Sequence, residues 1–510
     1  MNKKLFIISI ALTIIYALFT LNTILHHEIW ADEAQVWQLC KYLSFTELLN
    51  HLHNEGHPPL FYLIIMPFAR LFTDIIYMKL ICWISMCAAV FLLMYYSPFN
   101  IWLKLAIVLS SGFIYFFPVL ARNYSIIPFL VFLAAILYSK TKQHPVLYAL
   151  TIALIANTHI IMYVFSILLG IIFYYENILL NLRNKNIKEI KSYIAALIIM
   201  AMGFYLVFWE LISTPSSNVS FKLSFAQTGY TAIRMVLLFF ISSFNYDLCW
   251  HIQYYVMGLS STLNLPLIDI FTVLIMTLIY IFSFIVLFVN SKKWFFTAFL
   301  GIGFQFAIYI FAYNNLMYVN RVFCAHLILI FCFWMLFYND EFKSRYKIFG
   351  KKFSSIILTL FFAITIYNGI HYTYSDIRKE YAGARKTAEF IKENIDPENS
   401  VIMIESEPYM VALVYYLNGS HELYSAFRKK NLRYVIWDNI TKSNFADAGW
   451  AGYISYLKET DHRDYYVINV KADKKHVLEQ TQKDSFKLIY QTGDTIEPFE
   501  GHRIYKYIGK

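Results

Sequence analysis

Long runs of apolar residues set the strongest limit on how this chain can fold. The first run, Leu5–Leu25, contains no charged residue. At 1.5 Å of rise per residue, a helix of about 20 residues crosses a hydrocarbon core of ~30 Å. Ten further apolar runs lie near 76–96, 101–118, 124–139, 146–158, 160–180, 192–213, 267–289, 294–312, 320–338 and 353–371. The sequence therefore predicts an all-α polytopic membrane protein with about 11 transmembrane helices.

The composition supports this class and excludes others. Charged residues make up 15% of the 510 residues, whereas soluble domains average ~25%. The net charge of +10 comes from 43 Lys and Arg against 33 Asp and Glu. In a membrane protein such an excess is typical of cytoplasmic loops and of contact with anionic membrane lipids, so we expect no nucleic-acid partner. The 6 cysteines form no CxxC pair, which predicts neither a zinc site nor a disulfide framework.

Basic residues between the apolar runs predict the orientation. Lys3 and Lys4 precede the first run, so the N-terminus is expected in the cytoplasm. A cleaved signal peptide is disfavoured, because the run is long and no small-residue cleavage site follows it closely. The later basic loops are expected on the cytoplasmic side too, so an even number of spans must separate each of them from the next. This requirement divides 146–180 into two short spans that turn near Asn157–His159. The C-terminus is then extracytoplasmic in a multi-pass protein of the cell membrane. Ala232–Phe244 is interpreted as a re-entrant or interfacial helix.

The composition changes after Tyr372. This predicts two domains, a transmembrane domain over 1–371 and a small extracytoplasmic α/β domain over 372–510. In the second domain, apolar residues recur at helical spacing over 381–395. Further expectations are a helix between Pro408 and Leu417, and strands at 401–404, 433–437, 465–470 and 486–490.

The polar chemistry of the transmembrane domain lies in the first outer loop, 26–75. Asp32 and Glu33 follow the first apolar run by only a few residues, which places them at the membrane surface, where a carboxylate can meet a lipid-borne head group. Glu55 precedes Gly-His-Pro-Pro, and the two prolines end any helix before them and hold Glu55 on a rigid turn. The apolar stretch Leu60–Leu71 is too short to span and is expected in the interface. A plain solvated loop, anchored by interfacial tryptophans, is the competing interpretation.

Two motifs in this loop resemble those of the GT-C glycosyltransferases. Trp-x-Asp-Glu-Ala at 30–34 and Glu-Gly-His-Pro-Pro-Leu at 55–60 are similar to the protein O-mannosyltransferase and lipid A aminoarabinose transferase superfamily. The resemblance covers about residues 1–340. The aminoarabinose branch has Lys before its Pro, whereas this chain has His57, so the donor of that branch is not carried over.

The resemblance implies roles for particular residues. Asp32 matches the catalytic base, with Glu33 beside it. Glu55 matches a second active-site carboxylate, which is metal-associated in some members. Arg122 and Tyr124 resemble an Arg-x-Tyr motif at an outer helix end. The resemblance adds two further site candidates. They are His159, in a polar turn, and His57, directly before the two prolines.

Family members use a polyprenyl-phosphate sugar as donor and transfer it to a cell-envelope acceptor. Direct displacement at the anomeric carbon needs one base and inverts the configuration. The phosphate leaving group needs cations, and the planar fork of Arg suits this task. Arg122 and Arg321 are the candidates, and for Lys79 snorkelling to the lipid head groups is favoured. His326 is either a hydrogen-bonded core residue or a site residue.

Histidines in the first loop raise the question of a divalent metal ion. His51, Glu55 and His57, or His53 with His57, could ligate one. The spacing matches no defined zinc signature, and solvated interfacial histidines are the favoured interpretation. A metal held by Glu55 and His57 stays a possibility.

Two other classes of function compete with the transferase. A transporter or flippase of lipid-linked sugars should carry ionisable residues near the mid-bilayer, in broken helices that often occur in paired halves. Here the acids cluster in one outer loop, which favours the enzyme. A non-catalytic membrane subunit should tolerate Asp32→Asn. The sequence specifies neither the sugar nor the acceptor.

Overall fold

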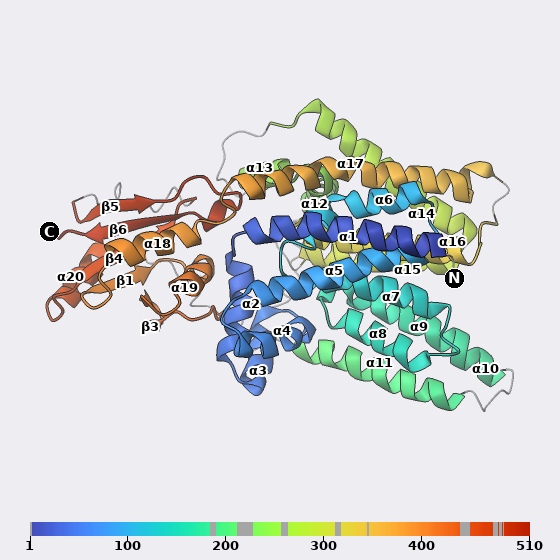
Figure 1. The fold of residues 1–510 in the computed structure, drawn as a ribbon, viewed down its shortest axis with the longest axis horizontal. Helices are drawn as coiled ribbons and strands as arrows, with labels where there is room; N and C mark the ends of the chain where they lie inside the picture. Colours follow the sequence, from blue (N-terminus) through green and yellow to red (C-terminus); the bar gives the residue numbers. More distant parts are fainter. Residues whose placement is uncertain are drawn as a thin grey trace.

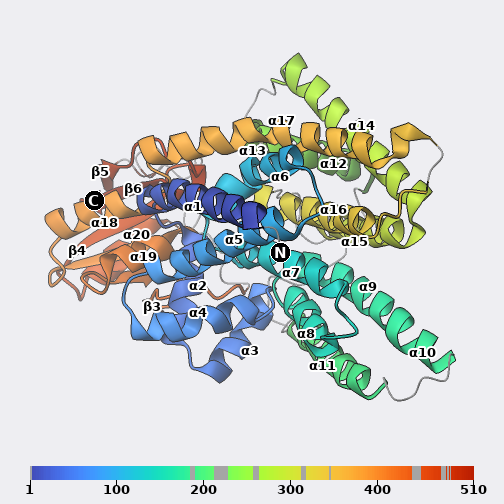
Figure 2. The same ribbon diagram turned by 45° about the vertical axis from the view of Figure 1, so that its right-hand side comes forward.

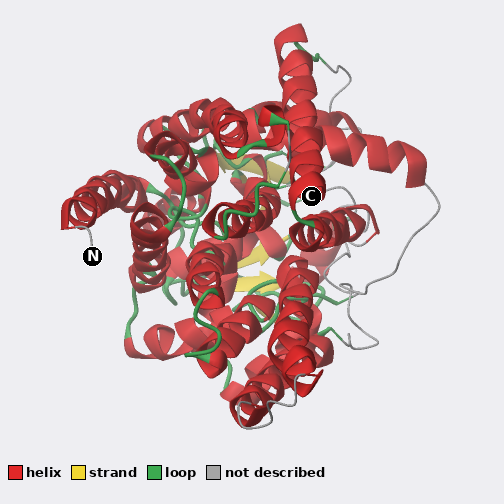
Figure 3. Ribbon diagram, turned by 90° about the vertical axis from the view of Figure 1, so that its right-hand side faces the viewer, coloured by secondary structure: helices red, strands yellow, loops and turns green. Residues whose placement is uncertain are grey.

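The computed structural model describes residues 3–183, 190–211, 228–256, 264–311, 318–343, 346–438, 449–472, 478, 482 and 484–509. Within these residues, a bundle of helices carries a six-stranded sheet at one end (Figure 1). We call this the domain end of the bundle. The N-terminus lies toward the opposite end (Figure 1). Figure 3 looks along the bundle from that opposite end, so that the strands lie behind the helices.

Eight helices in the described part of the chain are long and apolar enough to cross a membrane. This confirms the polytopic membrane class. They are α1 (Lys3–His26), α5 (Ile76–Tyr96), the Ile160–Arg183 segment that contains α9 (Tyr163–Tyr174), α11 (Ile190–Glu210), α14 (Leu267–Asn290), α15 (Lys292–Phe311), α16 (Val319–Tyr338) and α17 (Lys351–Arg378).

The other three predicted spans are helices shorter than a full crossing. They are α6 (Ile101–Leu109) with the π-turn η1 (Gly112–Phe116), then η2 (Asn123–Ile126) with α7 (Ile127–Tyr138), and α8 (Pro145–Ala156). The predicted turn at Asn157–His159 is confirmed, because α8 ends at Ala156 and the 3-10 turn η3 (Ile160–Met162) begins after His159. The His159 side chain accepts a hydrogen bond from Ile161 N at 3.2 Å and so caps this turn.

One helix beyond the eleven predicted spans lies within the bundle. α12 (Thr228–Phe244) packs against α14, α15, α16 and α17, and α13 (Tyr246–Val256) follows it directly. Of the two interpretations of Ala232–Phe244, this packing agrees with a helix that enters the bundle and disagrees with one that lies on its surface.

The first loop folds into three short helices, α2 (Ala31–Tyr42), α3 (Phe45–Glu55) and α4 (Leu60–Leu71). Ser44 and Glu47 form a capping box that starts α3. Gly56 ends α3 with φ 67°, a left-handed conformation that glycine adopts without steric cost. Glu55 is thus the last residue of α3, directly before the turn to α4. The α4 helix is an apolar helix of 12 residues, as predicted.

The C-terminal part is an α/β domain, as predicted. Its strands are β1 (Ser400–Ile404), β2 (Leu423–Ser425), β3 (Lys430–Asn431), β4 (Asp464–Val470), β5 (Phe486–Gln491) and β6 (His502–Tyr507), in the order β3-β2-β1-β4-β6-β5. β1 is parallel to β2 and β4, and the other pairs are antiparallel. The predicted strand at 433–437 is wrong, because this stretch is irregular chain beyond β3.

Helices cover both faces of this sheet (Figure 2). α18 (Ala384–Asn394) and α19 (Val411–Leu417) share a buried apolar cluster with alternate residues of the strands, such as Ile402 and Ile404. On the other face, α20 (Trp450–Lys458) packs on Met403 and its neighbours. This alternation follows from the two-residue period of a strand.

The first loop and the C-terminal domain share one apolar core. Trp37 of α2 and Phe61 of α4 belong to the same buried cluster as Ile404 and Leu413 of the sheet domain. α17 runs unbroken past residue 371 to Arg378 and leads into this domain. The domain is therefore docked on the loop that carries the predicted active site.

Candidate functional site

An ion pair between Asp32 and Arg122 lies at the domain end. Asp32 is in the first turn of α2, where a helix N-terminus stabilises negative charge, and its Oδ2 lies 2.6 Å from Nη1 of Arg122. Arg122 comes from the loop between η1 and η2, and its side chain is 10% exposed, against 46% for Asp32. A buried guanidinium needs such a partner. The half-exposed carboxylate can in turn take a proton from an incoming molecule.

Glu33 points into the protein, away from solvent. It is fully buried, and its Oε1 accepts a hydrogen bond from Ala121 N at 2.7 Å. Its Oε2 lies 3.4 Å from Nε2 of His27. This burial does not agree with the expected catalytic role. Glu33 instead binds the backbone of Ala121, the residue next to Arg122.

A buried polar network lies beneath the first loop. His27 Nδ1 is 2.7 Å from Oδ2 of Asp376, and the Tyr115 hydroxyl donates to the same oxygen at 2.8 Å. Burial lowers the pKa of His27, but the carboxylates of Asp376 and Glu33 outweigh it and raise the pKa above its ordinary value. The network therefore holds the imidazole of His27 between two carboxylates.

Lys79 belongs to this network and not to the lipid surface. It is 3% exposed, and its Nζ donates to the backbone oxygen of His27 at 2.7 Å. The snorkelling interpretation of Lys79 is therefore wrong. The reason is that the first loop folds back over the end of α5 and covers the amine.

A second cluster joins Tyr124, His159 and Arg321. The Tyr124 hydroxyl is 2.9 Å from Nε2 of His159, and Arg321 Nε donates to the same hydroxyl at 3.1 Å. His57 lies beside them, with its ring centroid 5.1 Å from that of His159. Burial, then the charges of Arg122 and Arg321, lower the pKa of His57 well below its ordinary value. His57 is therefore neutral at pH 7.

Glu55 lies in the same region and is held by Gln35 and His51. Its Oε1 accepts hydrogen bonds from Nε2 of Gln35 at 2.7 Å and of His51 at 3.1 Å. Its side chain is 6% exposed. Gln35 follows Asp32 by three residues on α2, so its hydrogen bond ties Glu55 to the helix that carries Asp32. The predicted residues Asp32, Glu55, His57, Arg122, Tyr124, His159 and Arg321 thus gather at one end of the bundle.

The histidines do not assemble a metal centre. In the part of the chain that the structure describes, no three His, Cys, Asp or Glu side chains are placed to hold a metal ion. His51 bonds to Glu55, and His53 bonds to the backbone oxygen of Glu210 at 3.2 Å. A metal held by Glu55 and His57 therefore gains no support. His326 is a hydrogen-bonded core residue, with Tyr280 at 2.5 Å and Ser243 at 3.1 Å.

The C-terminal domain adds residues that the sequence analysis did not identify. Glu500 Oε1 accepts a hydrogen bond from Ala31 N at 3.1 Å, one residue before Asp32. Ala31 and Glu500 are 469 positions apart, and no sequence motif links them. Only the docking of the sheet domain brings them together.

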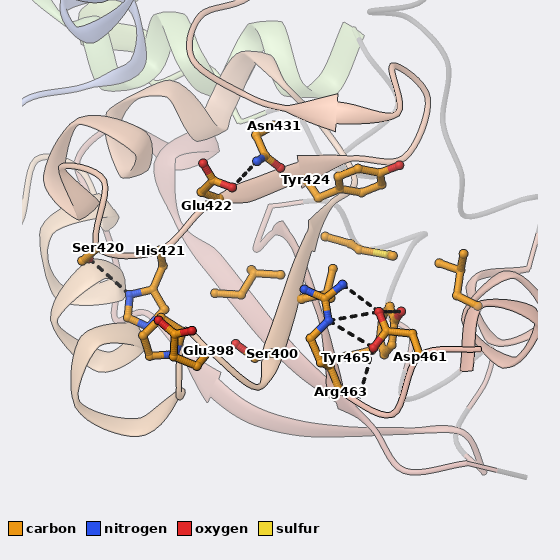
Figure 4. A pocket seen from close by; sticks show the side chains of 15 residues that line it. Glu398, Ser400, Ser420, His421, Glu422, Tyr424, Asn431, Asp461, Arg463 and Tyr465 are labelled. Atoms are coloured by element: carbon orange, nitrogen blue, oxygen red, sulfur yellow. Dashed lines mark hydrogen bonds and ion pairs between the residues drawn. The ribbon is translucent and has the colours of Figure 1, made fainter. Parts of the chain in front are cut away.

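A separate cavity of about 500 Å³ lies in the sheet domain (Figure 4). Ser400, His421, Glu422, Asp461 and Arg463 are among its lining residues. Its polar groups are bound by other protein groups, since Arg463 pairs with Asp461 at 2.7 Å, Asn431 donates to Glu422, and His421 bonds to a backbone oxygen at 2.8 Å. The cavity shares no residue with the Asp32 site, and its geometry defines no reaction.

Fold and site together define a polytopic membrane protein with an ion pair between Asp32 and Arg122 at one end of its bundle. Comparison with protein-family models found no match, and comparison with curated proteins found none either. Among solved structures, the chain is similar to ArnT from Cupriavidus metallidurans bound to undecaprenyl phosphate. That match has a TM-score of 0.43 and 10% identity, and covers 99% of this chain and 98% of that one.

The same protein in the apo state matches with a TM-score of 0.42 and 10% identity, over 98% of this chain and 97% of that one. ArnT is a lipid A aminoarabinose transferase. A likeness of this strength carries no argument about activity, which has to come from the residues of the site.

Proposed function

We propose that the protein is an integral membrane glycosyltransferase of the GT-C type. It moves a sugar from a polyprenyl-phosphate donor to a cell-envelope acceptor, which is a lipid, a polysaccharide or a protein. The observation that carries this proposal is the 2.6 Å pair between Asp32 and Arg122. It combines an accessible base with a buried cation, and a second guanidinium, Arg321, binds the hydroxyl of Tyr124, two residues after Arg122.

The reaction is a single displacement. Asp32 accepts the proton of the acceptor hydroxyl while that oxygen attacks the anomeric carbon. The bond from this carbon to the phosphate oxygen breaks, and polyprenyl phosphate leaves with the electron pair. Arg122 and Arg321 stabilise the phosphate oxygens, because a guanidinium has five N–H donors and can bind a phosphate while keeping other partners. Attack from the face opposite the leaving group inverts the anomeric configuration.

The placement of basic residues supports an extracytoplasmic site. α1 begins at Lys3, α15 at Lys292 and α17 at Lys351, all at the end of the bundle away from the sheet domain (Figure 1). Basic loops are retained in the cytoplasm. We therefore place the Asp32 site and the C-terminal domain on the extracytoplasmic side of the cell membrane.

The test uses the purified full-length protein and a panel of polyprenyl-phosphate sugars with cell-envelope extract as acceptor. Release of polyprenyl phosphate is followed for wild type, Asp32→Asn and a control, Asp74→Asn, which changes an exposed acid of the same loop. Loss of the base should lower the rate by ~10²–10⁴-fold, and the control should keep the wild-type rate.

Equal rates for Asp32→Asn and wild type would remove Asp32 as the base. If wild type consumes no donor but moves it intact across a vesicle membrane, the protein is a transporter and the proposal is wrong.

A further inference from the structure

Asp376 is a buried carboxylate that the proposed reaction does not use. It lies in the last turn of α17 and is 2% exposed. Its Oδ2 lies 2.7 Å from Nδ1 of His27 and accepts a hydrogen bond from the Tyr115 hydroxyl at 2.8 Å. A buried carboxylate is costly unless such partners hold it. These contacts therefore fix Asp376 and the imidazole of His27 relative to each other.

His27 connects Asp376 to the first turn of α2. Its second ring nitrogen, Nε2, lies 3.4 Å from Oε2 of Glu33, and both side chains are fully buried. The backbone oxygen of His27 accepts a hydrogen bond from Nζ of Lys79 at 2.7 Å, which holds the residue from the side of α5. The imidazole thus has a fixed orientation, with a carboxylate oxygen beside each ring nitrogen.

Glu33 extends this series of contacts to the segment that carries Arg122. Its other oxygen, Oε1, accepts a hydrogen bond from Ala121 N at 2.7 Å. Arg122 is the next residue along the chain. An unbroken series of side-chain contacts therefore leads from Asp376 on α17 to the backbone beside the buried guanidinium.

The same segment, residues 121–124, also holds the second arginine. Tyr124 lies two residues after Arg122, and its hydroxyl accepts a hydrogen bond from Nε of Arg321 at 3.1 Å. The segment thus sets the spacing between the two guanidinium groups. A phosphate bound by both groups depends on this spacing, because hydrogen bonds weaken steeply when their distances and angles leave a narrow range.

We propose that Asp376 is a positioning residue for the phosphate of the polyprenyl-phosphate donor. It acts through His27 and Glu33 on segment 121–124 and so keeps the two arginines at the spacing that a phosphate requires. Its own contacts are with His27 and Tyr115, so it acts on the donor only through other residues. This inference rests on the proposed transfer reaction, which supplies the phosphate.

Asp247 on α13 provides a matched control. Like Asp376, it contacts one imidazole and one tyrosine hydroxyl, since its Oδ2 lies 3.0 Å from Nε2 of His371 and its Oδ1 accepts from Tyr372 at 2.6 Å. Its side chain is 55% exposed, and these contacts join α13 to α17. Asp247→Asn therefore removes the same kind of charge without changing the contacts of His27.

The binding test measures the Kd of radiolabelled, sugar-free polyprenyl phosphate for the full-length protein. Asp376→Asn should raise this Kd at least tenfold, because the arginines lose the spacing that binds the phosphate with both groups. Asp247→Asn should stay within twofold of wild type. Thermal unfolding shows whether each variant is folded.

A second variant covers the case in which Asp376→Asn does not fold. Tyr115→Phe removes one hydrogen bond from Asp376 and keeps its charge. It should raise the same Kd at least threefold, and a Kd equal to that of wild type would then contradict the inference.

The kinetic test separates the donor from the acceptor. Asp376→Asn should raise the KM of the polyprenyl-phosphate sugar at least tenfold and leave the KM of the acceptor within twofold of wild type. A residue that only stabilises the fold would lower kcat with the folded fraction and leave both KM values unchanged. The difference between the two KM values therefore distinguishes positioning of the donor from general stability.

Two results would overturn the inference. One is equal binding of polyprenyl phosphate by Asp376→Asn and Asp247→Asn, and the other is an equal rise of both KM values in Asp376→Asn. A wild type that binds no polyprenyl phosphate would instead refute the proposed reaction, and the role of Asp376 would fall with it. If the wild type binds this lipid but transfers no sugar, the binding test alone decides the role of Asp376.

Discussion

At the residue scale, the first turn of α2 places two adjacent carboxylates in opposite environments. Asp32 is 46% exposed and paired with Arg122, whereas Glu33 is buried beside His27 and Ala121. Because successive residues on a helix point about 100° apart, one carboxylate faces the site and the other faces the interior. The Asp-Glu pair in the sequence therefore combines one reactive group with one positioning group.

This difference predicts separate effects of two isosteric changes. Glu33→Gln removes a buried negative charge beside His27 and Ala121, so it should lower the free energy of unfolding by ~3 kcal/mol. Asp32→Asn should lower the transfer rate by ~10²–10⁴-fold and cost less stability than Glu33→Gln. It takes the charged partner from the buried Arg122, but Asp32 itself is half exposed and Asn still accepts a hydrogen bond from Arg122. Thermal unfolding measured beside activity checks both, and a larger shift for Asp32→Asn would contradict the assignment.

The sequence identified the residues of the site where local motifs carry them. Asp32, Glu55 and Arg122 were expected in a common site, and the structure brings them into one region. Glu500 and the environment of Lys79 could not be predicted, because their neighbours come from distant parts of the chain. Lys79 needs the fold of the first loop over α5, and the contact of Glu500 with Ala31 needs the docking of the sheet domain.

At the scale of elements, the break between α8 and η3 supports the site. Asn157 Nδ2 donates to the backbone oxygens of Ala153 and Gly203 at 2.8 and 2.9 Å, and Asn157 O accepts from Leu60 N at 3.3 Å. The turn that carries His159 is thus fixed by α11 on one side and by the start of α4 on the other. His159 in turn binds Tyr124.

The close contact of α8 with α11 gives a test of this support. A Cβ added at Gly203 would meet Ala153 Cβ at 2.5 Å and its Cα at 3.1 Å, whereas one at Gly303 on α15 would meet nothing within 4 Å. Gly203→Ala should therefore destabilise the protein by ~1–3 kcal/mol through overpacking and lower transfer by displacing the His159 turn.

Gly303→Ala is the matched control and should leave thermal unfolding and transfer unchanged. Equal melting temperatures for the two variants would mean that α8 and α11 do not depend on this contact.

Hydropathy predicted where the helices lie but not how they end. Each of the eleven apolar runs coincides with helix, yet 101–116 is divided by the break before the π-turn η1. Side-chain packing between helices decides such breaks, and a single sequence does not show which helices are neighbours. In the sheet domain, β6 and α20 were missed, whereas β1, β4 and β5, which have clear apolar runs, were found.

At the scale of the whole molecule, the sheet domain and the first loop form one structural unit. They share a buried apolar cluster, and α17 connects the bundle to the sheet domain. Glu500 of the C-terminal domain binds Ala31 N beside Asp32, so this domain contacts the start of α2 directly.

The pKa of Glu497 predicts how pH affects this unit. Burial and Asp32 raise it to about 8, above ~4.3 for an unfolded chain. The folded protein thus binds a proton that the unfolded chain releases, so this contribution to stability is present below pH ~4.3 and is lost as pH rises through 8. Thermal stability should fall between pH 6 and 9, and less so in Glu497→Gln. Asp494→Asn, which changes an exposed acid of the same domain, is the control and should follow wild type. Identical dependence of thermal stability on pH for all three proteins would contradict a buried, protonated Glu497.

The central claim is a single displacement at the anomeric carbon with Asp32 as base. The most direct measurement is the anomeric configuration of the sugar by NMR, in the donor and in the product that wild type forms with its acceptor. The account predicts that the configuration is inverted and that Asp32→Asn forms no product at a measurable rate. A product with retained configuration, or a product formed equally well by Asp32→Asn, would contradict it.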